Sequence, residues 1–379
     1  MGIVLFFVIF GVVVIAHEFG HFIIAKANGI SVVEFTVGMG PCIFSVKKGG
    51  TKYAIRLLPL GGACIFEGED GIERDTEKKE AESGEADPQQ DVQQAVANTE
   101  LGSKKKPGAF PDAPVFARIA TVLAGPVFNF ILAFVFSIVL IHFTGCDPAR
   151  LTTVVEHSAA EDAGIVVGDT VTAINGKKIY NYREILLYMQ AENPSKPVTL
   201  SIEHADGSKE SVVVTPKVDN EGNYKLGVAG GYVASTGFGN DIKYAGLELR
   251  YWVKATVTGL RMIVTGGVKN GDIMGPVGVG SAMNEVIEEA KDISTTQKEA
   301  VINVILNLLN WSILLSVGIM NLLPIPALDG GRLLFLFIEA IRRKKIPQEK
   351  EAIVNFIGFA LLMVLMVVVF FNDIKNAFF

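Results

Sequence analysis

One apolar run near the start of the chain contains ionisable side chains, and this combination limits what the chain can fold into. Residues 3–27 are almost entirely apolar, yet the run includes His17, Glu18 and His21. A helix needs about 20 apolar residues to cross the hydrocarbon core of a bilayer. An ionisable side chain inside such a helix is costly unless it is satisfied, so it marks a functional site. The run therefore predicts a membrane-spanning helix that carries a site.

The rest of the chain supports a multi-pass membrane protein. Half of its 379 residues are hydrophobic and its mean hydropathy is +0.39, more than a soluble domain of this size usually carries. Three further runs, 119–143, 302–323 and 353–371, are long and apolar enough to span a bilayer. The first run has no basic start and no small-residue cleavage site, so we expect it to be retained. We predict an α-helical membrane protein with about four transmembrane helices.

Basic residues beside these spans predict their orientation. Short flanks rich in Lys and Arg stay on the cytosolic side of a membrane. Here such flanks follow the first span, precede the second, and separate the third from the fourth. Both termini and residues 144–300 are therefore expected to lie outside the cytosol.

The acidic excess of the chain is concentrated in one segment. Residues 67–107 are rich in charge, Gln and Ser and contain few large apolar side chains, a composition typical of disorder. We expect a solvated cytosolic linker, with a regulatory docking segment as the alternative. The formal net charge of -6 then says little about partners, and we expect no nucleic acid among them. Cys42, Cys64 and Cys146 are too widely spaced for a disulfide framework or a CxxC metal motif.

The spacing HEFGH indicates a metal site. Residues four apart on a helix share one face, so His17 and His21 can reach one cation while Glu18 points beside them. This is the HExxH geometry of a zinc hydrolase, in which two imidazoles hold Zn²⁺ and the Glu acts as general base towards an activated water. A histidine on an apolar face is otherwise a hydrogen-bonded core residue. The cost of a Glu inside the membrane favours the functional interpretation.

A catalytic zinc usually has three protein ligands, and Asp329 is the candidate for the third. At 1.5 Å per residue, His17 lies about 21 Å along the first helix, in the cytosolic third of a core about 30 Å thick. The third span enters from the same side, is broken by Pro324 and Pro326, and reaches Asp329 at about the same depth. Beside the glycines at 330–331, this Asp suits a metal ligand with room for a substrate backbone. The alternative is that Asp329 is the N-cap of the next helix.

The long outer segment predicts a small β-rich domain. It contains short strands, a Gly-Asp turn at 168–169, an Asn-Gly turn at 175–176 and an amphipathic helix near 182–190. With "AGIVVGDTVTAINGKKI" as its most recognisable part, it resembles a PDZ domain, which binds an extended peptide at a sheet edge. An unrelated small β domain is the alternative. Further on, residues 241–267 are apolar on one face, and we expect an amphipathic helix on the outer membrane surface rather than a fifth span.

Three motifs together resemble the site-2 protease family of intramembrane zinc metalloproteases. They are HEFGH in the first span, GPVFNF at 125–130 in the second and NLLPIPALDGGR at 321–332 in the third. Within the family the chain is most similar to the bacterial regulator-of-sigma-E-protease type, with one PDZ domain. "FTVGMGPCIFS" and "YAIRLLPLGGACIFEGED" resemble the membrane-associated β segment of that type. Met39 stands where the family more often has Phe, and the 67–107 insertion is long, but neither touches the motifs.

The resemblance implies roles for individual residues. His17, His21 and Asp329 match the zinc ligands, and Glu18 matches the catalytic base. Asn321 matches an asparagine near the substrate backbone; alternatively, its amide satisfies carbonyls freed by Pro324. The same two interpretations apply to Asn129 in GPVFNF, and there we favour the structural one.

The function that follows is cleavage of single-pass membrane proteins inside or near the bilayer. The substrates would be anti-sigma factors or remnant signal peptides, trimmed beforehand by a site-1-type protease. The family implies the cytoplasmic (inner) membrane of a bacterium with the PDZ domain outside. There it would either capture a trimmed substrate end or filter substrates by size, and the resemblance favours the filter. A non-enzymatic PDZ scaffold with a structural or vestigial metal site is the alternative, although three ligands leave an open position. A metal transporter would need polar residues through several spans, and the sequence shows one cluster.

The predicted domains follow one another along the chain. They are a first transmembrane helix with a membrane-associated β segment (1–66), a disordered acidic loop (67–114), a second transmembrane helix (115–144), a PDZ domain (150–218), an interfacial segment with an amphipathic helix (219–300), and the third and fourth transmembrane helices with the LDG motif (301–379).

Overall fold

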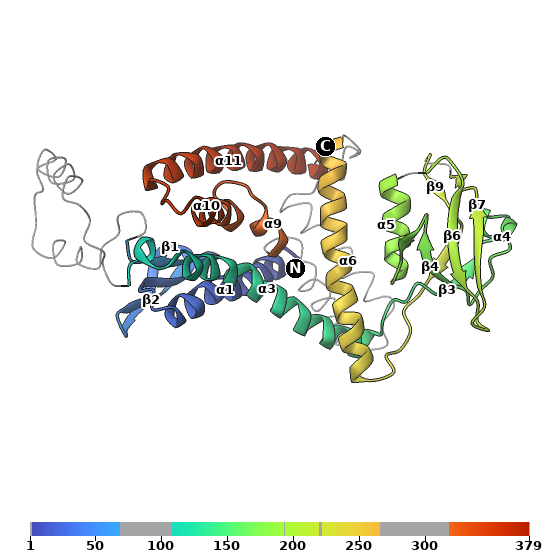
Figure 1. Cartoon of the computed structure of the whole chain (residues 1–379), viewed down its shortest axis with the longest axis horizontal. Helices are drawn as coiled ribbons and strands as arrows, with labels where there is room; N and C mark the ends of the chain where they lie inside the picture. Colours follow the sequence, from blue (N-terminus) through green and yellow to red (C-terminus); the bar gives the residue numbers. More distant parts are fainter. Residues whose placement is uncertain (1, 69–107, 193, 220–221, 266–317, 379) are drawn as a thin grey trace, which may run out of the picture. The chain divides into compact units, whose positions relative to one another are not determined.

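The structure is a computed structural model in which the chain forms two compact units (Figure 1). It describes residues 2–68, 108–192, 194–219, 222–265 and 318–378. The first unit comprises Met1–Asn129 and Ser316–Val368, and the second comprises Phe130–Leu315 and Val369–Phe379. Residues 69–107 of the predicted acidic loop and residues 302–317 of the predicted third span lie outside the described residues. The end of the segment predicted to be disordered (67–114) is ordered instead, since Phe110–Asp112 form a short 3-10 helix whose Phe110 is buried in the core of the first unit.

Three of the described helices can cross a membrane by length and composition. They are α1 (Gly2–Ala27), α3 (Val115–Thr144) and α11 (Gln348–Phe378), with apolar stretches at Phe10–Ala27, Val115–Thr144 and Lys350–Val369. These correspond to the first, second and fourth predicted spans. The described part therefore contains three helices that have the length and composition of the expected spans.

The two faces of α1 show why this helix suits a membrane. Apolar side chains three or four residues apart are exposed on one side: Val8, Val12, Ile15, Phe19 and Ile23. The opposite side is buried and includes both histidines of the HEFGH motif. An exposed apolar stripe of this kind fits lipid, while the polar groups face protein.

Helix α1 packs closely against α3 because both contain glycine at the contact. A Cβ atom on Gly20 would lie 2.5 Å from the carbonyl oxygen of Ala124 and 3.0 Å from Cβ of Phe128. Small residues allow two helix backbones to approach in this way. The contact brings the middle of α3 beside the histidines of α1.

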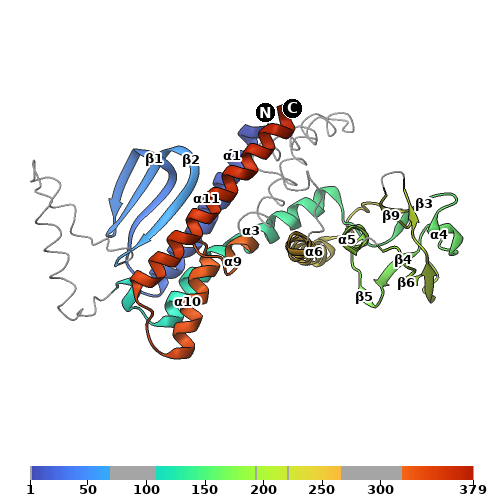
Figure 2. The same cartoon turned by 90° about the horizontal axis from the view of Figure 1, so that it is seen from above.

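Two long antiparallel strands lie beside α1 in both views of the first unit (Figures 1 and 2). Strands β1 (Val32–Lys48) and β2 (Thr51–Phe66) bend so that β2 pairs with both edges of β1, and Phe35 faces both Cys64 and Tyr53. Gly61, with φ of 81°, provides one of the bends. The strands expected in residues 1–66 are therefore present, and the last part of β2 passes along α1.

The helix break expected at Pro324 and Pro326 is present. Short helix α9 (Ile319–Leu322) ends before a non-helical loop, and α10 begins at Asp329 (Asp329–Arg342). A Cβ on Gly331 would lie 2.5 Å from the carbonyl oxygen of Ile325, and one on Gly330 would overlap the carbonyl of Leu323. Our expectation that these glycines leave room for a substrate backbone is wrong, since they bring the first turn of α10 against the chain's own loop.

A buried ion pair joins α3 to α10. Nη1 of Arg118 donates to Oε2 of Glu339 at 3.1 Å, and its Nη2 donates to Oε1. The guanidinium also donates through Nε to the carbonyl of Ala113 at 3.1 Å. Both charged side chains are nearly buried, 8% and 13% exposed. The pair fixes the helix that begins with Asp329 against the helix that contacts His21.

Breaking this pair is expected to destabilise the protein strongly. Arg118→Met leaves the carboxylate of Glu339 buried without its partner, which costs about 3–5 kcal/mol. The measurement is the Tm of the purified protein in detergent. The matched control is Lys177→Met, which breaks an exposed pair with Glu192 and is expected to cost less than about 1 kcal/mol. Equal Tm values for the two variants would contradict the prediction.

The second unit contains the β-rich domain predicted from the outer segment. Its main sheet has the order β5-β4-β6-β7, and two smaller pairs are β3 with β10 and β8 with β9. The bounds are β3 Leu151–Val154, β4 Thr170–Ile174, β5 Lys177–Lys178, β6 Val198–Glu203, β7 Lys209–Val214, β8 Lys217–Val218, β9 Tyr224–Lys225 and β10 Val228–Gly230, with helices α4 (Ala159–Asp162) and α5 (Tyr182–Glu192). Strands β9 and β10 lie beyond the predicted boundary at 218, and β10 pairs with β3 inside it, so the domain extends further than predicted.

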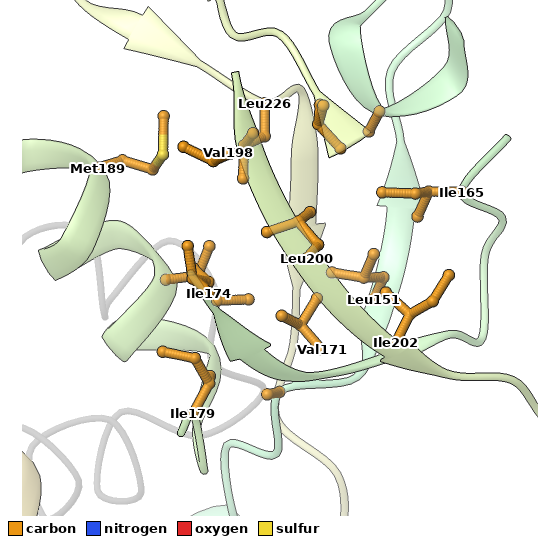
Figure 3. Packing of buried hydrophobic residues seen from close by; sticks show 14 of the residues in the cluster. Leu151, Ile165, Val171, Ile174, Ile179, Met189, Val198, Leu200, Ile202 and Leu226 are labelled. Atoms are coloured by element: carbon orange, nitrogen blue, oxygen red, sulfur yellow. The ribbon is translucent and has the colours of Figure 1, made fainter. Parts of the chain in front are cut away.

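Local sequence explains this domain well. Asn175 and Gly176 both have positive φ, 48° and 76°, and join β4 to β5 as an Asn-Gly turn should. Alternate residues of the strands point into one apolar core beneath α5, including Val171, Leu200 and Ile202 (Figure 3).

The amphipathic helix expected over 241–267 is α6 (Phe238–Thr265). It lies beside α5 in both views (Figures 1 and 2). Four ion pairs connect the two helices: Arg183 with Glu248, Arg250 and Lys254 with Glu184, and Arg261 with Glu192. The charges of its polar face are therefore directed at α5, while apolar side chains such as Val253 and Val257 are exposed.

Candidate active site

The three predicted metal ligands meet at one point in the first unit. Helix α1 presents His17 and His21 one turn apart, and α10 presents Asp329 as its first residue. Oδ2 of Asp329 lies 2.9 Å from Nε2 of His17 and 3.3 Å from Nε2 of His21, and the two nitrogens are 3.1 Å apart. Both histidines are buried, 5% and 7% exposed. Side chains from opposite ends of the sequence thus converge as predicted.

This arrangement fits a zinc ion. Oδ2 of Asp329 is buried and has no hydrogen-bond partner of regular geometry among the described residues, although both imidazoles touch it. Three acceptor atoms at such short range repel one another unless a proton or a metal cation lies between them, and two imidazoles with one carboxylate are a donor set that zinc takes. Ligands at about 2.0–2.2 Å from a tetrahedral zinc are about 3.3–3.6 Å apart, close to the separations seen here.

The side chain of Asp329 does not act as a helix cap. The N-cap position of α10 is Leu328, which provides no side-chain hydrogen bond. The carboxylate of Asp329 is directed instead at the two imidazoles. The geometry therefore favours the metal ligand over the N-cap among the two interpretations of this residue.

Helix α3 sets the protonation of His21. Nδ1 of His21 lies 2.8 Å from the carbonyl oxygen of Thr121. A carbonyl oxygen only accepts, so Nδ1 carries a proton, and in the neutral imidazole Nε2 then has the free lone pair that faces the cluster. Backbone carbonyls commonly hold metal-binding histidines in this way.

A glycine of α3 makes room for both imidazoles. A Cβ on Gly125 would overlap Nε2 of His21 and would lie 2.8 Å from Cε1 of His17. Thr121 and Gly125 are one turn apart on the same face of α3. The glycine of the GPVFNF segment is thus required by the close approach of α3 to the two histidines.

Glu18 lies beside the cluster, as its position in HEFGH predicts. Its carboxylate accepts a hydrogen bond from the backbone N–H of Cys64 in β2. A Cβ on Gly62 would lie 3.1 Å from Cγ of Glu18, so β2 runs directly along this side chain. Sequence reasoning missed both contacts, because they involve backbone and glycine positions that carry no chemical signature.

Asn321 also reaches the cluster. Its Nδ2 lies 3.3 Å from Nε2 of His17, at the end of α9 just before the helix break. All five predicted site residues, His17, Glu18, His21, Asn321 and Asp329, are therefore brought together. Since Glu18 and Asp329 would carry two negative charges among apolar spans, a divalent cation would balance them.

Comparisons with known proteins identify the family. Residues 5–365 match the model of peptidase family M50. Zinc metalloprotease RasP of Geobacillus kaustophilus (strain HTA426) is 35% identical over 431 residues, covering 100% of this chain and 98% of that protein. Regulator of sigma-W protease RasP of Bacillus subtilis (strain 168) is 34% identical over 441 residues, covering 99% of each. A solved PDZ domain of an SdrC-like protein from Listeria monocytogenes matches 22% of this chain and 87% of its own, at 20% identity and a TM-score of 0.20.

The chain belongs to peptidase family M50. It is a membrane-embedded zinc metalloprotease of the site-2 protease kind, so the predicted family, enzyme class and cofactor are confirmed.

Proposed function

We propose that the chain cuts single-pass membrane proteins inside or near the bilayer during regulated intramembrane proteolysis, with His17, His21 and Asp329 as zinc ligands and Glu18 as the base. One observation carries the proposal: the three donor atoms lie within 4.8 Å of one another, two of them on a helix that can span a membrane. Anti-sigma factors are the substrates that the name regulator of sigma-W protease suggests. Remnant signal peptides are a second substrate class.

Each residue has a chemical task. Zn²⁺, when bound, supplies the Lewis acidity that activates a water and polarises the scissile carbonyl. His17, His21 and Asp329 would hold it, and three protein ligands are the number typical of a catalytic zinc site. Glu18 accepts the proton of the attacking water and passes it to the leaving amine. The hydrogen bond from the Cys64 N–H holds its carboxylate beside the cluster.

The substrate must expose a peptide bond before it can be cut. A transmembrane helix uses its carbonyls in its own hydrogen bonds, so it has to unwind to an extended segment. The amide of Asn321, next to Nε2 of His17, is suited to hydrogen bond the backbone of such a segment. We therefore assign Asn321 to substrate binding.

The placement in the cell follows from the basic flanks and the family. We propose a bacterial cytoplasmic membrane protein with four spans, the third including residues 302–323, and with both termini outside the cytosol. The β-rich domain, which we regard as a PDZ domain, would act outside as a size filter after a site-1-type protease has trimmed the substrate. Helix α6 would lie on the outer membrane surface, since its exposed face is apolar.

The rival function is a PDZ membrane scaffold with a structural metal site. A closed structural zinc site normally has four protein ligands, whereas the described residues supply three His or Asp donors. A scaffold would also have no need for Glu18 beside the metal, where its burial is costly.

A cleavage assay tests the proposed function. The purified protein is incubated in detergent with a tagged single-pass substrate, with and without a zinc chelator, and the products are sized and sequenced by mass spectrometry. We expect a cut within or next to the transmembrane segment, its loss on chelation, and its return when zinc is added back. Cleavage that persists without metal would overturn the zinc mechanism, and no cleavage of several substrates by the zinc-loaded protein would favour the scaffold.

A further inference from the structure

Asn129 is a buried amide whose hydrogen bonding is incomplete. Its side chain is fully buried in α3, and its Nδ2 lies 3.2 Å from Nδ1 of His17. Its Oδ1 is buried and has no hydrogen-bond partner among the described residues. An unsatisfied buried acceptor costs about 1–3 kcal/mol, so this atom needs an explanation.

The chemistry of His17 supplies one. Nε2 of His17 is directed at His21 and Asp329, and when that nitrogen binds a cation the proton of the neutral imidazole is on Nδ1. A protonated Nδ1 is a donor and cannot hydrogen bond to the NH₂ end of an amide. The two ends of an amide have nearly the same size, so a half turn of the Asn129 amide places Oδ1 against Nδ1–H and pairs this acceptor with this donor, while the NH₂ end takes the former place of Oδ1.

We propose that Asn129 is a positioning residue whose Oδ1 accepts the Nδ1 proton of His17 and thereby fixes the tautomer and the ring orientation of this zinc ligand. The inference rests on the zinc site of the proposed function. Asn129 would thus be the hydrogen-bond acceptor for Nδ1 of His17, as the carbonyl of Thr121 is the acceptor for Nδ1 of His21. Such partners of metal-binding histidines raise the basicity of the ligand and hold its ring.

The spacing of the contacts on α3 supports this role. Thr121, Gly125 and Asn129 are four residues apart, so they lie on one face of the helix. The first accepts from His21, the second admits both imidazoles, and the third faces His17. One face of α3 therefore serves both histidines. The amide of Asn129 contacts His17 and not a backbone carbonyl, which is the kind of partner that the structural interpretation of this residue needs.

The test compares three properties of the Asn129 side chain: its hydrogen-bond acceptor, its hydrogen-bond donor and its volume. Asn129→Asp keeps an oxygen acceptor at the same size, Asn129→Leu keeps the size without hydrogen bonding, and Asn129→Ala removes both. The zinc Kd of the metal-free protein in detergent is measured by competition with a chromophoric chelator, and Co²⁺ loading reports ligand geometry through visible absorption. Ser137→Ala, at another fully buried polar residue of α3, is the matched control.

We expect Asn129→Leu and Asn129→Ala to weaken zinc binding by about 10- to 100-fold and to alter the Co²⁺ spectrum, because the orienting partner is lost. Asn129→Asp and Ser137→Ala should retain wild-type affinity and spectrum. Wild-type affinity in both Leu and Ala variants would overturn the inference, as would equal weakening in Asp, Leu and Ala. If the wild-type protein itself binds no zinc, the proposed function fails and the inference fails with it; if only the inference fails, the wild-type protein still binds zinc and cleaves.

Discussion

Glu18→Gln is expected to lower kcat/KM for substrate cleavage by about 10²–10⁴-fold, the usual contribution of a general base. Gln has the shape of Glu but cannot accept a proton from water at neutral pH. Its amide oxygen can still accept the hydrogen bond from the Cys64 N–H, so β2 should keep its place beside α1. The zinc content of the protein should stay at the wild-type level, because the three proposed ligands are untouched. The measurements are cleavage of the tagged substrate and metal analysis of the same sample.

The control is Glu156→Gln, the same change at an exposed Glu of the second unit, which should leave both quantities unchanged. Two outcomes would contradict the assignment. Wild-type cleavage by Glu18→Gln would exclude Glu18 as the base. Loss of zinc together with loss of cleavage would instead make Glu18 part of the metal-binding structure.

The local parts of the site were predictable because they depend on helix geometry. His17 and His21 share a face through their spacing, and Glu18 must then point beside them. The third ligand could also be found, since membrane depth is a simple count of residues along a helix. Asp329 does lie against both histidines, while the count itself starts in residues 302–317, outside the part of the chain that the structure describes.

The contacts made by backbone could not be predicted in the same way. The backbone N–H of Cys64 donates to Glu18, and the backbone carbonyl of Thr121 accepts from His21. Nearly every residue has these two backbone groups. The sequence contains no sign of which one will be used. The role of Gly331 was misjudged for a related reason: a glycine indicates a close approach, but the sequence does not tell whether a substrate or the chain's own loop makes it.

In the second unit too, a local feature was predictable from the sequence and contacts between distant elements were not. The Asn-Gly turn at 175–176 forms from its own two residues, and its positive φ angles were expected. The ion pairs between α5 and α6, such as Arg250 with Glu184, were not. A charged face of an amphipathic helix looks the same in the sequence whether water or a neighbouring helix covers it.

Gly125→Ala is expected to disable the zinc site by steric overlap alone. The added Cβ would lie 2.6 Å from Cε1 of His21 and 2.8 Å from Cε1 of His17, distances at which atoms repel strongly. Either α3 moves away from α1 or the imidazoles turn out of the cluster, and interiors packed to crystal density allow neither without loss. We expect zinc affinity and kcat/KM both to fall by about 100-fold, the upper end of what misorienting a metal-binding histidine costs.

Two measurements distinguish this steric effect from a general loss of folding. Gly259→Ala makes the same change in α6, where nothing lies within 4 Å of the new Cβ, and should leave zinc binding unchanged while stabilising the helix by up to about 1 kcal/mol. For Gly125→Ala, the Tm of the metal-free protein should stay close to the wild-type Tm even though zinc affinity falls. The reason is that the added Cβ overlaps the imidazoles and not the apolar contact of α1 and α3. Unchanged zinc affinity in Gly125→Ala would mean that α3 does not approach the histidines this closely. The bond from His21 to Thr121 and the proposed role of Asn129 depend on the same approach, so they would then have to be abandoned as well.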